Sequence, residues 1–384
     1  MSADEFAPLR SRLARVMDDQ GGWPEDSPWV RDAVEAVPRH HFATDRVWTW
    51  DGSRYAPVDR ETDPGRWAEL VYPASPLEAT ITQITQGLPS SSLSCQSVVV
   101  DMLDSLMAEP GHRVLELGTG MGWNAALLTA RVGSGRVTSV EVDSLLADAA
   151  RERLAAMRAG ARVVVGDGAA GRPERAPYDR LIATYAVDEV PWGWVEQTRP
   201  GGRIVTPWGR LGHVALTVAP DGGSATGWVQ GLAQFMPARG TDQGRTLSEV
   251  RGDTMPDIGG SFARQDLLPL HADVSLLFAL RVLLPDVRIT TKADKAAVTA
   301  WLHDGRSSWA TLVTQEDGRV VAYQGGPRRL ADETDQAWQR WQNAGTPSLW
   351  DFGMTRTPYE QYIWSGNQES GPRWSPVSQP ARIA

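Results

Sequence analysis

The chain has 384 residues, of which 41% are hydrophobic and 22% charged, the composition of a globular protein rather than a disordered one. Its formal net charge of −9 argues against nonspecific binding of nucleic acid; the acidity either keeps the protein in solution or steers a basic peptide toward it. The single cysteine, Cys95, excludes an internal disulfide and a thiolate metal site, and the six histidines show no paired ligand spacing. We therefore expect no bound metal.

Residues 1–90 are predicted to form a helical lead-in followed by an insertion loop. Apolar residues such as Leu9 and Leu13 recur at helical spacing within 8–37, whereas the run 48–73 is polar and rich in Pro, Gly and Asp, which predicts a long loop. No signal-peptide segment opens the sequence, and no run reaches the roughly 18 to 20 apolar residues of a spanning helix. We expect a cytoplasmic protein that does not engage a membrane.

Residues 91–240 are predicted to form an α/β core. Short β-branched runs such as RVLEL and RVTSVEV alternate with helical stretches between about residues 97 and 220. This alternation predicts a mostly parallel, Rossmann-like sheet with helices on both faces. Ligands of such sheets bind beyond the carboxyl ends of the strands, so we expect the functional site at that edge.

Residues 241–384 are predicted to form a small accessory α+β domain. A Gly-rich polar stretch at 241–261 indicates the junction. Beyond it, the sequence predicts a helix over Leu267–Leu284, a hairpin that turns at Asp317-Gly318 and a helix over Glu333–Asn343. The last twenty residues lack periodicity, and we expect them to be disordered.

The strongest local signal is a glycine string between a buried strand and a helix. Gly118, Gly120 and Gly122 follow the strand RVLEL and open the helix Trp123–Arg131. Glycines let the backbone turn sharply and approach a ligand, and a helix N-terminus presents free amide groups. The string alone is also typical of other nucleotide-binding turns.

Two acidic residues at later strand ends narrow the choice of ligand. Glu141 closes RVTSVEV, where a carboxylate can accept both ribose hydroxyls, and Asp167 closes VVVGD, where it can accept the adenine amino group. The glycine spacing differs from that of dinucleotide enzymes, so we predict S-adenosylmethionine as the ligand, with S-adenosylhomocysteine as its product. The predicted cofactor-binding residues are Glu116, Gly118, Thr119, Gly120, Gly122, Asn124, Glu141, Val142, Asp167 and Gly168.

Over roughly residues 5–220 the sequence resembles the protein L-isoaspartate O-methyltransferases. The shared motifs are VPRHHF (37–42), the serine-rich run 90–97, GHRVLELGTGMGWNAALL (111–128), GDG (166–168), APYDRLIAT (176–184) and RPGGRIVTP (199–207). The resemblance implies a Rossmann-like class I methyltransferase. It also implies that Ser94 is the catalytic serine that touches the accepting carboxylate beside the methyl donor. The implied substrate-binding residues are Ser92, Ser94, Cys95 and Thr184, with no catalytic role for Cys95.

The whole chain is most similar to methyltransferases of actinobacterial ribosomal-peptide pathways of the graspetide and lanthipeptide type. The shared motifs are SVEVD (139–143), QTRPGG (197–202), FMPARG (235–240), QGGPRRL (324–330) and DFGMT (351–355). This resemblance implies esterification of an Asp side chain in a precursor peptide, followed by closure to an aspartimide. The sequence departs from both groups at Gln96, where the family usually has proline, so we expect the acceptor loop to differ there.

Three functions remain open. The first is a monomeric enzyme that esterifies an Asp of a precursor peptide. The second is a repair enzyme that acts on isoaspartyl residues of damaged proteins, against which the added domain and Gln96 count. The third is a non-catalytic subunit that binds S-adenosylmethionine and serves a partner.

Overall fold

The computed structural model describes residues 5–209, 212–242, 244–252, 262, 264, 266–294 and 297–375. The chain forms two compact units. Unit 1 contains the residues up to 208, together with 213–239 and 356–359, and unit 2 contains 209–212, 240–355 and the residues from 360 onward. Residues 1–90 and the α/β core therefore share one unit. The junction expected at 241–261 lies partly outside the described residues.

Unit 1 begins with two helices in the region where the sequence predicts them, α1 (Ala7–Asp19) and α2 (Trp29–Ala36). The prediction of a long loop at residues 48–73 is wrong, because this run forms a hairpin and a helix. The elements are β1 (Arg46–Trp50), β2 (Tyr55–Asp59) and α3 (Pro64–Val71), followed by β3 (Thr80–Thr85) and β4 (Leu88–Leu93). The four strands form a small sheet in the order β2-β1-β3-β4, so β4 lies at its edge.

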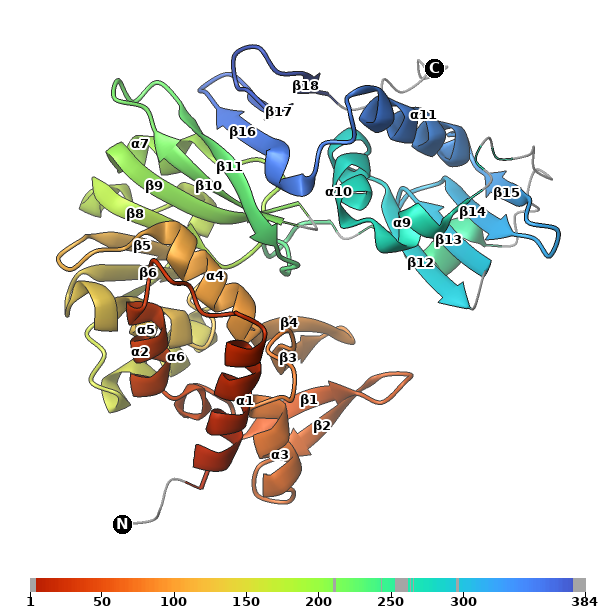
Figure 1. The fold of residues 1–384 in the computed structure, drawn as a ribbon. Coiled ribbons are helices and arrows are strands. Elements are labelled where there is room, and N and C mark those ends of the chain that lie inside the picture. The colour runs from red at the N-terminus through yellow and green to blue at the C-terminus, as the bar shows by residue number, and fades with distance from the viewer. Residues whose placement is uncertain are drawn as a thin grey trace. The chain divides into compact units, whose positions relative to one another are not determined.

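The core of unit 1 is the predicted Rossmann-like sheet (Figure 1). Its strands are β5 (Val114–Leu117), β6 (Val137–Glu141), β7 (Arg162–Val165), β8 (Tyr178–Ala183), β9 (Thr198–Trp208), β10 (Gly212–Val218) and β11 (Ala225–Leu232). Their order is β11-β10-β9-β8-β5-β6-β7. From β7 through β9 all pairs are parallel. The chain runs outward from β5 to β7 and then returns to β8, so the strand order reverses between β5 and β8.

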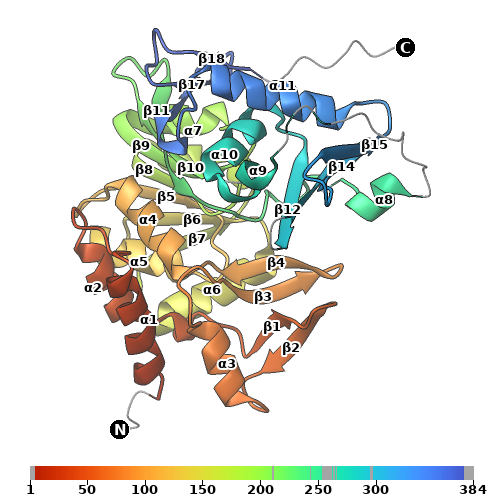
Figure 2. The ribbon, with the colours of Figure 1, turned by 45° about the vertical axis from the view of Figure 1, so that its right-hand side comes forward.

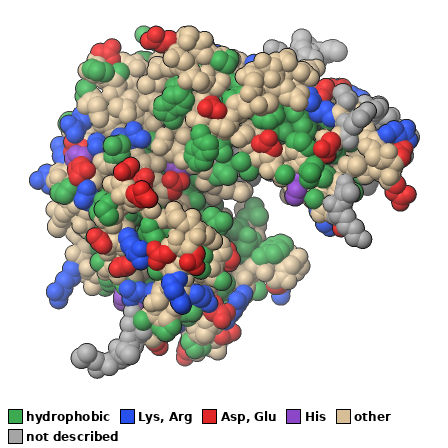
Figure 3. Space-filling view, in the orientation of Figure 1, with side chains coloured by type: hydrophobic (Ala, Val, Ile, Leu, Met, Phe, Trp, Pro, Cys, Tyr) green, Lys and Arg blue, Asp and Glu red, His purple; other side chains and the backbone are tan. Residues whose placement is uncertain are grey.

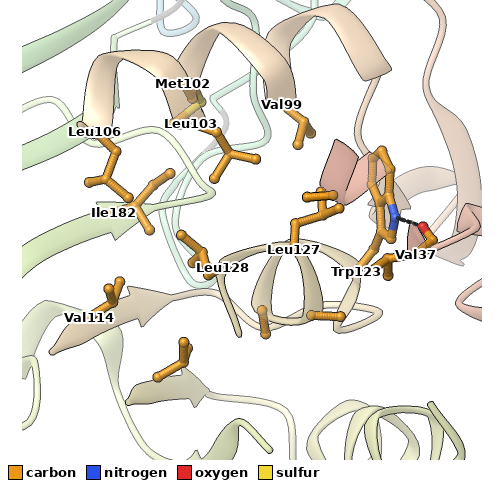
Figure 4. Packing of buried hydrophobic residues seen from close by; sticks show 14 of the residues in the cluster. Val37, Val99, Met102, Leu103, Leu106, Val114, Trp123, Leu127, Leu128 and Ile182 are labelled. Atoms are coloured by element: carbon orange, nitrogen blue, oxygen red, sulfur yellow. Dashed lines mark hydrogen bonds between the residues drawn. The ribbon is translucent and has the colours of Figure 1, made fainter. Parts of the chain in front are cut away.

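Both faces of this sheet are covered. On one face α2 packs with α4 (Gln96–Leu106), α5 (Trp123–Val132) and α6 (Ser144–Ala156) in a cluster that includes Val114 and Ile182 of the sheet (Figure 4). Leu115 and Leu117 of β5 point to the opposite face because side chains alternate along a strand, and both are fully buried. The Trp123 indole nitrogen donates to the Val37 carbonyl at 2.9 Å, which joins α5 to the end of α2.

Unit 2 is a small α+β unit. Its sheet contains β12 (Arg288–Asp294), β13 (Ala297–His303), β14 (Trp309–Thr314) and β15 (Val320–Gly325), antiparallel and in chain order. The predicted turn at Asp317-Gly318 joins β14 to β15, and α11 (Leu330–Asn343) packs against this sheet (Figure 2). Unit 2 also contains α8 (Leu247–Arg251), β17 (Gln361–Ser365), β18 (Arg373–Trp374) and all but the last residue of β16 (Phe352–Arg356).

Two expectations for this region need correction. The single helix predicted over Leu267–Leu284 is interrupted and forms α9 (Leu268–Ala272) and α10 (Val274–Leu283). The break falls at Asp273, whose carboxylate caps α10 by accepting the backbone N–H of Ser275. The last twenty residues, expected to be disordered, include β18; residues 376–384 lie outside the described part.

Acidic and basic side chains are interspersed over the face of unit 1 seen in Figure 3. Among the helices of the described residues, none has the length and apolarity that crossing a membrane requires.

Candidate active site

The glycine turn lies at the carboxyl end of β5, where the chain enters α5. Gly118 and Gly120 have φ angles of +91° and +51°, a region that residues with a Cβ rarely adopt. An added Cβ at Gly118 would lie 2.5 Å from the Thr184 hydroxyl oxygen, whereas at Gly120 it would meet no atom within 4 Å. The backbone at Gly120 therefore faces open space that a ligand can enter. Gly122 completes the turn as the residue before α5.

A buried polar network supports this turn. The fully buried Glu116 carboxyl accepts hydrogen bonds from Asn124 Nδ2 at 2.8 Å and from the Ser139 hydroxyl, and Ser139 also bonds the Thr119 hydroxyl. Burial raises the pKa of Glu116 to about 7, although the bonds from Ser139 and Asn124 act in the opposite direction. These side chains engage one another and shape the turn. Direct contact of Glu116, Thr119 or Asn124 with a cofactor stays a prediction.

Glu141 ends β6 beside the turn. Its carboxylate accepts the backbone N–H of Gly120 at 2.9 Å and that of Asp143 at 3.1 Å, which uses two of its roughly four lone pairs. The next residue, Val142, exposes 50% of its surface. An anchored carboxylate beside an exposed apolar side chain fits a ribose hydroxyl pair and the face of a purine ring. With the open space at Gly120, these residues fit S-adenosylmethionine.

Tyr185, two residues beyond the end of β8, is a candidate site residue that the sequence analysis missed. Its ring lies against Gly118 and its hydroxyl against Gly168, so a side chain at either glycine would collide with it. Burial, with the neighbouring carboxylates of Asp167 and Glu141, raises the pKa of the Tyr185 hydroxyl. The tyrosine thus covers the space between the two glycines. Its place in the sequence, just beyond a predicted strand, could have indicated it, because β8 runs parallel beside β5 and ends at the same edge of the sheet.

The other predicted residues at this edge make local contacts. Asp167 is exposed after β7 and caps the short helix η2 (Gly168–Ala170) by accepting the N–H of Ala169 at 2.9 Å. The Thr184 hydroxyl donates to the carbonyl oxygens of Leu117 and Gly118. Thr184 therefore supports the first residue of the turn, and its predicted contact with the substrate is not tested by these bonds.

The predicted acceptor residues lie on β4 and on the short segment that joins it to α4. We refer to residues 92–95 as the acceptor segment. Ser92 and Ser94 are both half-buried, and neither hydroxyl has a hydrogen-bond partner within the described part of the chain. Cys95 precedes α4, with its Sγ 4.0 Å from the Ser97 hydroxyl. Gln96, in place of the family proline, starts α4 and is buried. The hydroxyl of Ser94 is thus available to bond an incoming carboxylate.

Arg39 holds the acceptor segment in place. It begins the short helix η1 (Arg39–His41) and is 2% exposed. Its Nη1 donates to the Ser94 carbonyl at 2.9 Å and its Nη2 to the Leu93 carbonyl at 3.2 Å. The guanidinium carbon also lies 4.9 Å from the ring centroid of Trp123. Because Trp123 is the first residue of α5, Arg39 connects the acceptor segment to the helix that follows the glycine turn.

Arg239, the arginine of FMPARG, makes a second connection. Its Nη1 pairs with the Asp143 carboxylate at 2.7 Å, and its Nη2 donates to Gln83 Oε1 at 3.0 Å and to the Ser90 carbonyl at 3.3 Å. Asp143 lies two residues beyond Glu141, whereas Gln83 and Ser90 belong to the hairpin that leads to the acceptor segment. The sequence analysis gave Arg239 no role.

Within the described residues, no three metal-ligating side chains come together. The groups at this edge are carboxylates, hydroxyls and backbone amides around an open glycine turn. The sheet reverses its strand order at that turn, and the next strand ends in an anchored acidic residue. This arrangement defines an S-adenosylmethionine-dependent methyltransferase of class I.

The comparisons with known proteins identify the family. The model for protein-L-isoaspartate(D-aspartate) O-methyltransferase (PCMT) matches residues 53–221. Protein-L-isoaspartate O-methyltransferase 1 of Archaeoglobus fulgidus is 32% identical over 247 residues, which cover 64% of this chain and 100% of that protein. The chain belongs to the protein-L-isoaspartate O-methyltransferase family, and it is a carboxyl O-methyltransferase that acts on proteins or peptides.

Two further similarities complete the comparison. The protein-L-isoaspartate O-methyltransferase of Halorhodospira halophila is 44% identical over 219 residues, which cover 56% of this chain and 84% of that protein. A solved protein-L-isoaspartate O-methyltransferase structure is 21% identical with a TM-score of 0.49, and the match covers 93% of this chain and 100% of that one.

Proposed function

We propose that this enzyme esterifies an Asp side chain of a ribosomally made precursor peptide and thereby starts the formation of an aspartimide. The additional unit carries the proposal. The family model matches residues 53–221, which leaves nearly all of unit 2 outside the matched residues. The motifs QGGPRRL and DFGMT, which resemble peptide-modifying enzymes, lie in that unit. The partner we expect is a basic peptide, which the net charge of −9 would attract to a monomeric, cytoplasmic enzyme.

The transfer itself needs no general base. S-adenosylmethionine supplies a methyl group on a positively charged sulfur. An Asp carboxylate has a reference pKa of about 4 and is ionised at neutral pH. One of its oxygens forms the new bond to the methyl carbon, while the electron pair of the broken carbon–sulfur bond stays on sulfur. The enzyme therefore has to align the two reactants and exclude water.

The side chains at the site divide this task. The Ser94 hydroxyl donates a hydrogen bond to the carboxylate oxygen that does not attack. This bond orients the other oxygen toward the methyl carbon. Arg39 keeps the Ser94 backbone in place through the carbonyl bond at 2.9 Å. Glu141 and the open backbone at Gly120 hold the donor, and Tyr185 shields the space beside them from water.

The ester prepares the second step. The backbone nitrogen of the following residue attacks the ester carbonyl and forms the carbon–nitrogen bond of a five-membered imide. The methoxy group leaves with the proton of that nitrogen as methanol, so the peptide loses one water overall. A following glycine hinders this nitrogen least, so an Asp-Gly site closes fastest.

Repair of isoaspartyl residues is the second candidate, because the similar proteins of A. fulgidus and H. halophila carry that name. Both activities use the same chemistry and differ only in which carboxylate is presented. The third candidate is a non-catalytic subunit that binds S-adenosylmethionine. In such a subunit the Ser94 hydroxyl would have no acceptor carboxylate to bind.

Mass spectrometry separates these candidates. The full-length protein is incubated with S-adenosylmethionine carrying a deuterated methyl group and with three matched peptides: a basic Asp-Gly peptide, its isoaspartyl isomer and its Asn analogue. We expect gain of one labelled methyl group and then a net loss of one water from the Asp peptide alone. Turnover of the isoaspartyl isomer alone would overturn the proposal in favour of repair.

Ser94→Ala tests the acceptor side of the site. A hydrogen bond to a charged group contributes about 1.5 to 3 kcal/mol, so we expect kcat to fall by about 10- to 100-fold. Calorimetric binding of S-adenosylhomocysteine should stay unchanged. Ser97→Ala is the control, because it removes a nearby hydroxyl that already bonds the Pro76 carbonyl. Full turnover by Ser94→Ala would contradict the assigned role.

A further inference from the structure

A cavity of about 330 Å³ lies in unit 1 behind the acceptor segment. It is lined by residues of α1 and α2 and by the first residues of α4 and α5, and the lining includes Trp23, Arg39, Tyr72, Gln96 and Trp123. None of the donor-site residues Glu141, Asp167 and Gly120 lines it, and neither does Ser94. The cavity is therefore a space separate from the methyl-transfer site, although Arg39 contacts both.

The lining of this cavity includes a buried cation, Arg39, that has no counter-ion among the described residues. Arg39 makes no ion pair with an Asp or Glu of the described residues, and its bonds go to the carbonyls of Leu93 and Ser94 and to the Thr80 hydroxyl. Its Nε is buried and lacks a hydrogen-bond partner there. Burial lowers the pKa of Arg39 to about 10. A buried charge of this kind is costly unless an opposite charge pairs with it.

A second donor in the lining is also unpaired. The indole nitrogen of Trp23 is buried and has no hydrogen-bond partner in the described part of the chain. Neither this group nor the Arg39 Nε can accept a hydrogen bond, so both require an acceptor. Gln96, which is 5% exposed, adds a polar amide where the family usually has the apolar ring of proline.

We propose that this cavity binds a carboxylate-bearing molecule about the size of one amino-acid residue, with its carboxylate paired to Arg39. One carboxylate supplies a single negative charge to pair with Arg39 and two oxygens that can accept hydrogen bonds. A doubly charged phosphate would leave an uncompensated negative charge against one buried cation. The volume lies at the small end of the range for ligand sites, about 300 to 1,000 Å³.

The lining also indicates the way in. Ala7 and Ser11 of α1 and Glu35 of α2 are exposed, whereas Arg39, Gln96 and Trp123 are buried. The ligand therefore enters between α1 and α2 and places its charged end deepest. Neither Ser94 nor a donor-site residue lines this cavity, so ligand binding here can be measured without methyl transfer, although Arg39 also bonds the Ser94 carbonyl.

Ligand-detected NMR with the full-length protein tests the proposal. The probes are N-acetylglycine and its neutral amide, N-acetylglycinamide, which differ only in the charged group. We expect the acid to bind at least about tenfold more tightly than the amide, the difference that a charged hydrogen bond supplies. Equal binding of the two, no binding of the acid, or preference for inorganic phosphate would each overturn the proposal.

Variants locate the binding. Ala14→Phe fills the cavity from α1 without changing Arg39 and should abolish binding of the acid. Arg15→Ala, at the adjacent exposed position outside the lining, should leave it unchanged. Ser94→Ala should also keep it, which separates this site from the acceptor site. Arg39→Gln should remove the preference for the acid; if that variant fails to fold, Ala14→Phe still decides, because unchanged binding there contradicts the proposal.

Discussion

The carboxyl group of Glu116 makes the stability of unit 1 depend on pH. Its pKa is about 7 in the folded chain, against an ordinary value of 4.5. Between these values the folded state keeps the proton and the unfolded state does not. The contribution of this group to the free energy of unfolding therefore falls as the pH rises through that window and is constant outside it.

Glu116→Gln removes this titration. The wild type should lose stability as the pH rises from about 5 to 8, whereas the variant should not lose this contribution. The free energy of unfolding of the variant minus that of the wild type should therefore increase by up to about 3 kcal/mol over this range. Urea unfolding of both proteins at the two pH values measures the difference. Glu196→Gln, at an exposed position, is the control and should show no such change. A constant difference between Glu116→Gln and wild type would contradict the titration.

The sequence predicted the site residues that a local pattern marks and missed those whose partners are distant. The glycine string and Glu141 each follow a recognisable strand, so the strand pattern alone places both at the same edge of the sheet. Arg239 meets Asp143 across 96 positions and Gln83 across 156. No local pattern encodes such a meeting, because it depends on how the sheets pack.

At the scale of elements, the hairpin β1–β2 shows that a polar sequence does not exclude strands. The strands β1 and β2 bury few side chains, so they lack the alternation from which strands are predicted. Two local signals were nevertheless present. Asp51-Gly52 is a typical hairpin turn, and Asp63-Pro64 is a helix start, in which Asp63 caps α3 by accepting the Arg66 N–H.

Arg239→Gln tests the connection between the end of β6 and the hairpin β3–β4. The ion pair with Asp143 is partly exposed, with side-chain exposures of 38% and 18%, so its loss should raise KM for the peptide only about two- to fivefold. The difference from wild type should shrink at high salt. Arg31→Gln is a matched control, because Arg31 pairs with Asp18 at the same distance of 2.7 Å. An equal effect of both variants would contradict a specific role.

At the scale of the whole molecule, the chain does not divide at one point. After residue 239 it enters unit 2 and then returns to unit 1 for residues 356–359. The returning segment brings Arg356 into contact with residues of unit 1. Its side chain is 8% exposed, its Nε donates to the Val190 carbonyl at 2.7 Å, and its Nη2 pairs with Glu189 at 2.9 Å.

Arg356→Ala should therefore destabilise unit 1, although the residue lies far from the methyltransferase core in the sequence. Loss of a buried, charged hydrogen bond costs about 1 to 3 kcal/mol, which corresponds to a fall in Tm of several degrees. Calorimetric unfolding of the full-length chain measures it. Arg319→Ala, which removes a side-chain charge that is 78% exposed, should leave Tm unchanged, and equal Tm values for both variants would contradict the prediction.

The return of residues 356–359 also bears on how the protein is made. A ribosome that has completed the methyltransferase core must add more than a hundred further residues before Arg356 emerges, a delay on the order of ten seconds. During that interval the nascent core lacks its last buried arginine. A chaperone that holds nascent chains would thus meet unit 1 in an incomplete state, and premature termination within unit 2 would release a core without Arg356.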